Sequence, residues 1–274
     1  MMELNKKIDN SIKLLKSIKV DQIELSYSGG KDSDVILELA KLADIPYRAI
    51  YKNTTIDPKG TIQHCRKNGV EIINPQKSFF KLIEQHGFPT MRCRFCCDEL
   101  KEYKILDNSI QGIRRCESAK RAKNYKEPII CRIYGSKKNH VNVALPILDW
   151  TNNDVADFIE MQKIQCHPLY YVNGKFDVTK RLGCLCCPLK SDKGLADFKA
   201  NPKMVKAWIN AGQEWWNKPR KIEIRSKSKF DNVYELFAHN IFFSSYENFR
   251  LAKKGFFGEL DFKERLEKYF DIKL

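Results

Sequence analysis

The chain has 274 residues, of which 43% are apolar and 30% are charged, a composition typical of a soluble globular protein. This length is enough for one large or two ordinary domains with a substantial buried core. No apolar stretch approaches the length of a membrane span, and the basic N-terminal segment lacks the apolar region of a signal peptide. We therefore expect a cytoplasmic protein with no membrane partner.

The net charge of +15 indicates an anionic partner. Positive charge is concentrated in residues 101–140, where eleven Lys and Arg outnumber four Asp and Glu and leave a balance of +7. A second concentration, residues 218–229, has six basic residues and one acidic residue, Glu223. Both stretches fit contact with nucleic acid or with a small polyphosphate substrate, and a solvated basic surface is the alternative.

The first half of the chain alternates strand and helix patterns. Residues 1–20 are predicted to form an N-terminal helix, because their apolar residues recur at helical spacing. Apolar runs then predict strands, and the segments between them predict helices. The strands are expected at Ile23–Tyr27, Tyr47–Lys52 and 70–73, with helices after the first strand, at Thr61–Lys67 and at 78–86. This alternation predicts an α/β fold with a doubly wound, mostly parallel sheet.

The second half predicts more helix. Helices are expected at residues 98–105 and 152–162, the latter with Thr151 as its N-cap. Beyond Pro188 the pattern is helical, with Trp208, Trp215 and Trp216 among its core anchors. We therefore expect the N-terminal helix at 1–20, a nucleotide-binding domain at 21–189 that includes the cysteines, and a helical extension at 190–274.

A glycine-rich hexapeptide joins the first strand to its helix. Two glycines here allow backbone N–H groups to turn towards an anion, and the helix offers its positive N-terminal end. The spacing is not that of a Walker A loop, and a simple glycine turn is the alternative. The residues predicted to bind phosphates are Ser28, Gly29, Gly30, Lys31, Asp32 and Ser33. Asn53 and Thr54 follow the next strand at the same edge of the sheet and are expected near a nucleoside.

A basic segment supplies candidates for a second anionic group. Arginine forks bind phosphate or sulfate in a bidentate manner, which lysine does poorly. Arg114, Arg115 and Arg121 are therefore expected to hold such a group, and Glu117 to orient an arginine or bind ribose hydroxyls. A solvated basic helix is the alternative.

Six of the ten cysteines fall in two short clusters, which in a cytoplasmic chain favours metal or redox chemistry over disulfides. Each cluster contains a C-x-x-C pair, and four thiolates suit structural zinc or a [4Fe–4S] cluster. Thiolate chemistry leaves both metals open. The zinc set is Cys93, Cys96, Cys184 and Cys187, and the iron–sulfur set is Cys96, Cys97, Cys184 and Cys187.

Together these motifs resemble one family. The hexapeptide SGGKDS, the Cys96-Cys97 step, GIRRxESxxR, the PILDWTxxDV segment and the Cys184/Cys187 pair occur in the order typical of the phosphoadenosine phosphosulfate (PAPS) reductase family. This family lies within the PP-loop, or adenine nucleotide alpha-hydrolase, superfamily, and the resemblance spans residues 23–188. In its iron–sulfur branch, cysteines at the matching positions hold a [4Fe–4S] cluster. The resemblance therefore favours iron–sulfur over zinc.

One feature departs from the family pattern. The reductases carry a C-terminal cysteine that attacks the sulfate sulfur, whereas no cysteine follows Cys187 in this chain. Cys93 and Cys186 are the remaining thiols of the two clusters and are the candidates to replace it.

The resemblance implies an enzyme that binds ATP with Mg²⁺ and activates its target for sulfur transfer, as in DNA phosphorothioation or tRNA thiolation. Lys31, Asp32, Arg114 and Arg115 are the expected catalytic residues, with Lys31 offsetting charge on a leaving pyrophosphate and Asp32 holding Mg²⁺ or capping its helix. DNA or tRNA and a sulfur donor such as a cysteine desulfurase are the expected partners. One alternative is reduction of PAPS or adenylyl sulfate by a non-standard thiol. The other is a catalytically inactive regulator that senses nucleotides or binds nucleic acid.

Overall fold

The computed structural model describes residues 2–135, 139–219, 229–254 and 260–274. Most of the basic stretch at 218–229, and two of the bases in the stretch at 101–140, lie outside these residues. The chain divides into two compact units. The first, here called the sheet unit, comprises Met1–Pro75 and Asp98–Gly183; the second, called the helical unit, comprises Gln76–Cys97 and Cys184–Leu274.

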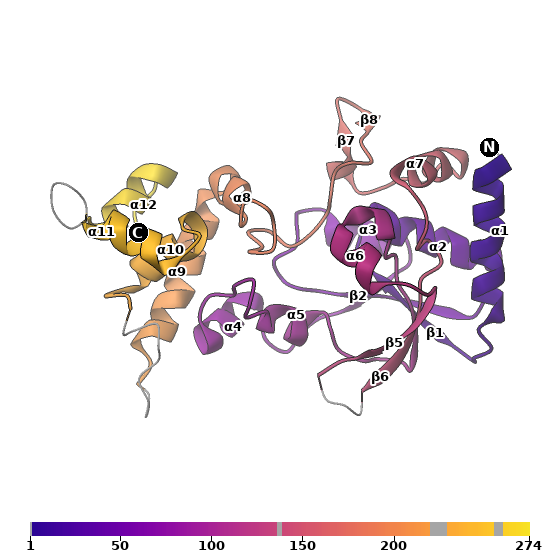
Figure 1. The fold of residues 1–274 in the computed structure, drawn as a ribbon, viewed down its shortest axis with the longest axis horizontal. Coiled ribbons are helices and arrows are strands. Elements are labelled where there is room, and N and C mark those ends of the chain that lie inside the picture. The colour runs from indigo at the N-terminus through magenta and orange to yellow at the C-terminus, as the bar shows by residue number, and fades with distance from the viewer. Residues whose placement is uncertain (1, 136–138, 220–228, 255–259) are drawn as a thin grey trace. The chain divides into compact units, whose positions relative to one another are not determined.

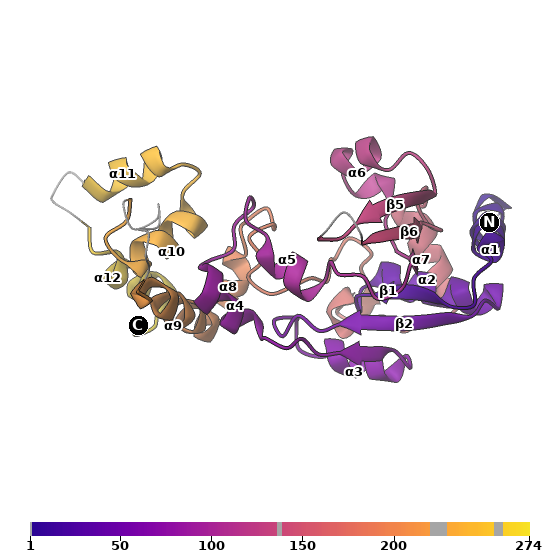
Figure 2. The same cartoon turned by 90° about the horizontal axis from the view of Figure 1, so that it is seen from below.

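The sheet unit is built on a six-stranded sheet with the order β3-β2-β1-β4-β6-β5. All neighbouring strands are parallel except β5 and β6, which form an antiparallel pair at one edge (Figure 2). The strands are β1 (Ile23–Tyr27), β2 (Tyr47–Lys52), β3 (Glu71–Ile73), β4 (Asn108–Ile110), β5 (Ile129–Ile133) and β6 (His140–Ala144). A two-stranded ribbon, β7 (Tyr171–Val172) and β8 (Lys175–Phe176), completes the unit. The predicted α/β class and mostly parallel sheet are confirmed.

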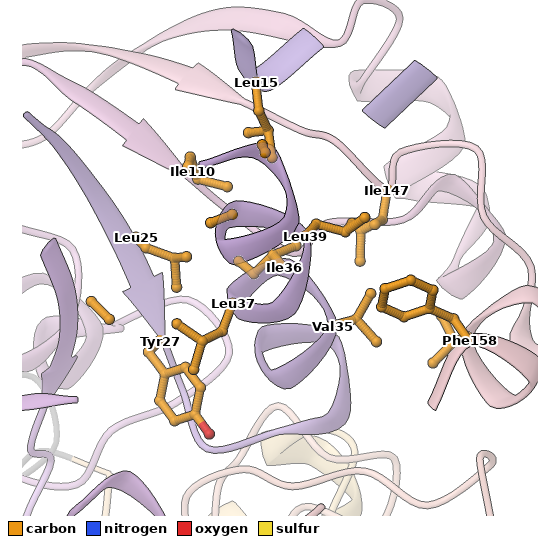
Figure 3. Packing of buried hydrophobic residues seen from close by; sticks show 14 of the residues in the cluster. Leu15, Leu25, Tyr27, Val35, Ile36, Leu37, Leu39, Ile110, Ile147 and Phe158 are labelled. Carbon is orange, nitrogen blue, oxygen red and sulfur yellow. The ribbon is translucent and has the colours of Figure 1, made fainter. Parts of the chain in front are cut away.

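Helices pack against the sheet, with α1 and α7 both packed against α2 (Figure 1). The helices and 3₁₀ turns of this unit are α1 (Met2–Ser17), α2 (Lys31–Ala43), α3 (Thr61–Lys67), α6 (Ala119–Asn124), α7 (Asn152–Met161), η1 (Arg115–Glu117) and η2 (Pro168–Tyr170). Leu25 of β1, Leu39 of α2 and Phe158 of α7 are fully buried in one core (Figure 3). Each such side chain stabilises the fold by about 1.5–3 kcal/mol through burial.

One of two further predicted helices agrees with the structure, and the other differs in its bounds. Thr151 caps α7 in a capping box with Asp154, as expected. The helix predicted at 98–105 is wrong in its bounds, because α5 covers Phe95–Leu100. The chain leaves the helix after Leu100, and the carbonyl of Tyr103 instead accepts a hydrogen bond from Lys52 Nζ at 2.6 Å.

The helical unit confirms the expected helical C-terminal region. Its helices are α4 (Phe79–His86), α8 (Leu195–Ala200), α9 (Pro202–Asn217), α10 (Val233–Phe242), α11 (Tyr246–Lys254) and α12 (Phe262–Phe270). Trp208 of α9 contacts Phe79, Phe88, Phe198 and Phe237, which forms an aromatic core. Because α4 packs against α9, residues 76–97 belong to this unit. The boundaries predicted at residues 20 and 189 stay a prediction.

None of the helices in the described part of the chain combines the length and the apolar character that crossing a bilayer requires.

Candidate functional site

The glycine-rich hexapeptide follows β1, the strand at which the strand order of the sheet reverses. β1 ends at Tyr27, the chain turns through the two glycines, and α2 begins at Lys31. β1 pairs with β2 on one side and with β4 on the other, so the loop follows the strand at the topological switch point. Ligands of open α/β sheets bind at this point, beyond the carboxyl ends of the strands. Gly30 is the N-cap of α2 and provides no side-chain cap, which leaves the helix N-terminus suited to an anion.

Close packing explains the glycines of the loop. Gly29 has a φ of +76°, in the left-handed region that favours glycine. A Cβ atom on Gly30 would lie 3.2 Å from the hydroxyl of Tyr170. A Cβ atom on Gly112, which follows β4, would lie 2.9 Å from the carbonyl oxygen of Asp32. Gly112 therefore allows the segment after β4 to approach the loop directly.

A cavity of about 240 Å³ is bounded by this loop, by the segment from Gly112 to Arg121 and by the segment from Tyr170 to Leu182. All three boundaries belong to the sheet unit. Its lining residues are Ser26, Ser28, Gly30, Lys31, Asp32, Ser33, Gly112, Glu117, Arg121, Tyr170, Arg181 and Leu182. The structure thus gathers most of the predicted phosphate-binding residues around one cavity.

Lys31 and Asp32 are two charged residues in the lining of the cavity. Lys31 Nζ lies 3.3 Å from Asp32 Oδ2 and donates a hydrogen bond to the carbonyl of Lys180 at 3.3 Å. The ammonium also lies 5.4 Å from the centroid of the Tyr170 ring. Burial lowers the pKa of Lys31, and the neighbouring Asp32 carboxylate partly opposes that shift. A phosphate in the cavity would restore the charge that burial disfavours.

Glu117 holds two arginines that line the same cavity. Its carboxylate forms ion pairs with Arg121 and with Arg181, the latter at 2.7 Å. The expectation that Glu117 orients an arginine therefore agrees with its contacts. Burial, and then the nearby Arg181, lower the pKa of Arg121, although both residues remain partly exposed. The wall offers guanidinium donors to an anion.

Arg114 and Arg115 do not line the cavity. Arg114 is 1% exposed, and its Nε lies 2.7 Å from Asp32 Oδ1 without the alignment of a hydrogen bond. A second nitrogen of Arg114 donates to Asn152 Oδ1 at 3.0 Å. Arg115 pairs with Asp149 and donates to the carbonyl of Tyr125 at 2.8 Å. Arg114 thus supports Asp32, whereas Arg115 joins surrounding segments of the chain.

Asn53 and Thr54 lie after β2 but do not line this cavity. The Asn53 amide donates to Asn74 Oδ1 at 2.9 Å, and Thr54 is buried. A neighbouring cavity of about 180 Å³ shares Ser26 and Ser28 with the first. Its other lining residues are Glu24, Tyr27, Ile50, Tyr51, Lys52, Lys101, Glu102, Gln111, Arg132 and Tyr134. The two adjoining cavities offer space for different parts of one ligand.

Two lining residues, Tyr170 and Arg181, are not among the residues predicted to form the site. The Tyr170 hydroxyl accepts a hydrogen bond from the backbone N–H of Leu182 at 3.2 Å. Arg181 lines the cavity and pairs with Glu117. The basic Lys180-Arg181 step shortly before Cys184 is the nearest thing to a local indication. Only the folded chain brings this step to the loop after β1.

Four cysteines gather in the helical unit. Cys96 and Cys97 lie in the first turn of α5, and Cys184 and Cys187 lie in a turn-rich segment before α8. A hydrogen bond with Cys97, burial, and the nearby Cys184 and Cys187 raise the pKa of Cys96. Within the described ranges, no group of three or more His, Cys, Asp or Glu has the geometry of a formed metal site. The thiol donors themselves have the softness that zinc and iron–sulfur clusters require.

The two remaining cluster thiols differ in exposure. Cys93 is exposed, and its backbone N–H donates to Thr90 Oγ1 at 3.0 Å. Cys186 is 1% exposed, and burial raises the pKa of its thiol to about 12. Of these two candidates for a replacement nucleophile, Cys93 is the accessible one.

Comparison with known proteins adds the following. Residues 22–190 match the family described as phosphoadenosine phosphosulfate reductase domain. An uncharacterized protein of Methanocaldococcus jannaschii is 30% identical over 203 residues, which cover 69% of this chain and 47% of that protein. A tRNA(Ile)-lysidine synthase of Francisella philomiragia is 28% identical over 169 residues, covering 52% of this chain and 39% of the synthase. A sulfate adenylyltransferase subunit 2 of Aeromonas hydrophila is 27% identical over 180 residues, covering 54% of this chain and 59% of the subunit. The chain spans about half the length of the curated relatives it matches.

Proposed function

We propose that this chain, which belongs to the phosphoadenosine phosphosulfate reductase domain family of PP-loop proteins, is an ATP-using enzyme that activates an acceptor for sulfur transfer. An acceptor oxygen attacks the α-phosphorus of ATP, the bond from that phosphorus to the bridging oxygen breaks, and pyrophosphate leaves. A sulfur nucleophile then displaces AMP from the adenylated acceptor. The observation that carries the proposal is the cavity at the N-terminus of α2, lined by Lys31, Arg121 and Arg181.

The lining suggests a division of roles. The backbone N–H groups of the loop would bind the β- and γ-phosphates, and Lys31 would offset the charge that develops on pyrophosphate. Arg121 and Arg181 would hold the second anionic group, while Arg114 positions Asp32. Asp32 lines the cavity, and its carboxylate would supply an oxygen ligand for Mg²⁺ while Oδ1 stays buried against Arg114 Nε.

The nucleoside is proposed to occupy the adjoining cavity. That cavity shares Ser26 and Ser28 with the phosphate cavity, so one nucleotide would extend across both. Asn53 and Thr54 follow β2, whose last residues line the adjoining cavity, and would contact the nucleoside after a small movement. Adenylyl transfer by the similar sulfate adenylyltransferase subunit supports ATP as the nucleotide.

Cys96, Cys97, Cys184 and Cys187 are proposed to hold a [4Fe–4S] cluster. A hydrogen bond with Cys97, then burial, then the charges of Cys97, Cys184 and Cys187 raise the pKa of Cys96, so the other three cysteines of this set lie near it. When bound, a cluster with four cysteine ligands would supply one-electron chemistry and would fasten α5 to the segment before α8.

The acceptor is proposed to be a nucleic acid, DNA or tRNA, with a sulfur donor such as a cysteine desulfurase. The net charge of +15 and the similarity to a tRNA(Ile)-lysidine synthase support this choice.

Reduction of PAPS or adenylyl sulfate is the second candidate. Exposed Cys93 is the observation that favours it, because a sulfonucleotide reductase needs an accessible thiol to attack the sulfate sulfur. The same arginine wall would then bind the sulfonucleotide.

One experiment separates these functions. Anaerobically purified protein is offered Mg-ATP with bulk tRNA or single-stranded DNA, and separately PAPS and adenylyl sulfate with a dithiol, and products are identified by mass spectrometry. AMP and pyrophosphate from ATP, lost in Lys31→Met and kept in Lys41→Met, are the expected result. Lys41 is the control because it lies on the same helix, paired with Glu38 on the surface. Sulfite from a sulfonucleotide, with no AMP from ATP, would replace the proposal with the reductase.

A further inference from the structure

A third cavity, of about 450 Å³, lies entirely within the helical unit. Its volume falls within the ~300–1,000 Å³ typical of small-molecule sites. The lining comes from the loop after α4, from α9 and α10, and from residues on either side of α10.

The cavity is rich in aromatic rings. Phe230 contacts His239 at 5.1 Å and Tyr246 at 5.5 Å between ring centroids, and Trp215 also lines the space. The Tyr246 hydroxyl donates a hydrogen bond to the carbonyl of Lys229 at 3.0 Å, which fixes the orientation of that ring. Tyr246 and His239 are only partly buried, so they offer ring surface to a ligand. Such rings stack on nucleobases whatever the base.

The charge of the lining is positive. Arg92 is exposed, and Lys229 Nζ lies 4.7 Å from the centroid of the Tyr246 ring. Among the described lining residues there is no Asp or Glu. Asn240 and Thr90 add polar groups, and His239 Nε2 has no hydrogen-bond partner in the described part of the chain. A ligand with a flat ring, hydrogen-bonding edges and a negative group matches this combination.

We propose that this cavity binds one nucleotide of a single-stranded nucleic acid. Its base stacks on the face of the Tyr246 ring that Lys229 Nζ covers in this structure, and Lys229 turns aside to contact the phosphate together with Arg92. Cys93 also lines the cavity and lies just before α5, the helix that carries Cys96, so the bound nucleotide would lie beside the proposed cluster segment. This inference rests on the proposed function, because it places the nucleic-acid acceptor. An acidic peptide would use the cations but not the stacked rings.

The test measures binding of short RNA and DNA oligonucleotides by fluorescence anisotropy in a salt series, without ATP. Tyr246→Leu is expected to weaken binding about tenfold or more, because it removes a stacking platform. Tyr269→Leu is the matched control: Lys199 lies 4.7 Å from the Tyr269 ring, and this pair lies outside the cavity. Lys229→Gln is expected to reduce the slope of log affinity against log salt by about one, whereas Lys199→Gln leaves it unchanged. The RNA and DNA arms show which nucleic acid is bound.

A second measurement does not depend on variants that fold poorly. Photo-crosslinking of an oligonucleotide carrying 5-iodouracil to the unaltered protein is expected to label a peptide containing Trp215, Phe230 or Tyr246. Labelling elsewhere, equal loss in the two tyrosine variants, or no oligonucleotide binding at all would overturn the inference. Release of AMP and pyrophosphate by the unaltered protein is assayed separately. The ATP proposal therefore fails or survives on its own result.

Discussion

Arg114→Met is the substitution that best separates a structural arginine from a ligand-binding one. Arg114 is 1% exposed and contacts the carboxylate of Asp32 and the side chain of Asn152. Removing one partner of a buried ion pair costs about 3–5 kcal/mol. Asp32 keeps its contact with Lys31 and is 18% exposed, so the lower figure applies. We expect a loss of about 3 kcal/mol in the free energy of unfolding of the sheet unit.

Thermal melting followed by circular dichroism measures this loss. For a unit of this size, ~3 kcal/mol lowers the melting temperature by about 6–12 °C. Arg115→Met is the matched control, since its partner Asp149 is largely exposed and a surface pair is worth about 0–1 kcal/mol. A melting temperature for Arg114→Met equal to that of Arg115→Met would refute the supporting role of Arg114. An unchanged melting temperature combined with lost ATP binding would instead make Arg114 a ligand-binding residue.

Three further outcomes follow from the site. Gly112→Ala should weaken ATP binding about tenfold or more, because the new Cβ would lie 2.9 Å from the carbonyl oxygen of Asp32; calorimetry that gives the unaltered affinity would contradict this. Cys97→Ser should abolish the iron content of anaerobically purified protein, whereas Cys93→Ser should leave it unchanged. Loss of bound zinc in Cys93→Ser but not in Cys97→Ser would support the zinc set instead. ATP affinity should fall as pH rises, and should begin to fall below 10.5, because burial lowers the pKa of Lys31 and its protonated form binds phosphate. Lys31→Arg should flatten the profile, and a profile unaffected by that substitution would exclude Lys31 as the titrating group.

The features that could be predicted from the sequence are those with local causes. A strand, two glycines and an amphipathic helix occur within a few turns of chain, so β1, the loop and α2 lie where they were predicted. The capping box of α7 is likewise encoded by Thr151 and Asp154, three residues apart. β4 has three residues, too few to show an alternating hydrophobic pattern in the sequence. Its pairing with β1 and β6 stabilises it. Tertiary pairing of this kind leaves little trace in the local sequence.

The arginine pair shows why composition could not assign roles. Arg114 has extended backbone, with φ −125° and ψ 139°, whereas Arg115 begins the 3₁₀ turn η1, so the chain changes conformation between the two residues. Arg114 therefore reaches Asp32, whereas Arg115 reaches Asp149. Two adjacent arginines look equivalent in a motif, although only Arg114 reaches the glycine-rich loop, at Asp32.

Glu117 links the two arginines that line the cavity. Arg121 and Arg181 are sixty positions apart, and their like charges repel; burial first, and then the charge of Arg181, lower the pKa of Arg121. The Glu117 carboxylate reduces this repulsion and engages one nitrogen of each guanidinium. Each guanidinium has five N–H donors, so most of them remain for a phosphate or sulfate. Glu117 thus lowers the net charge of its segment and at the same time keeps Arg121 and Arg181 together in the lining of the cavity.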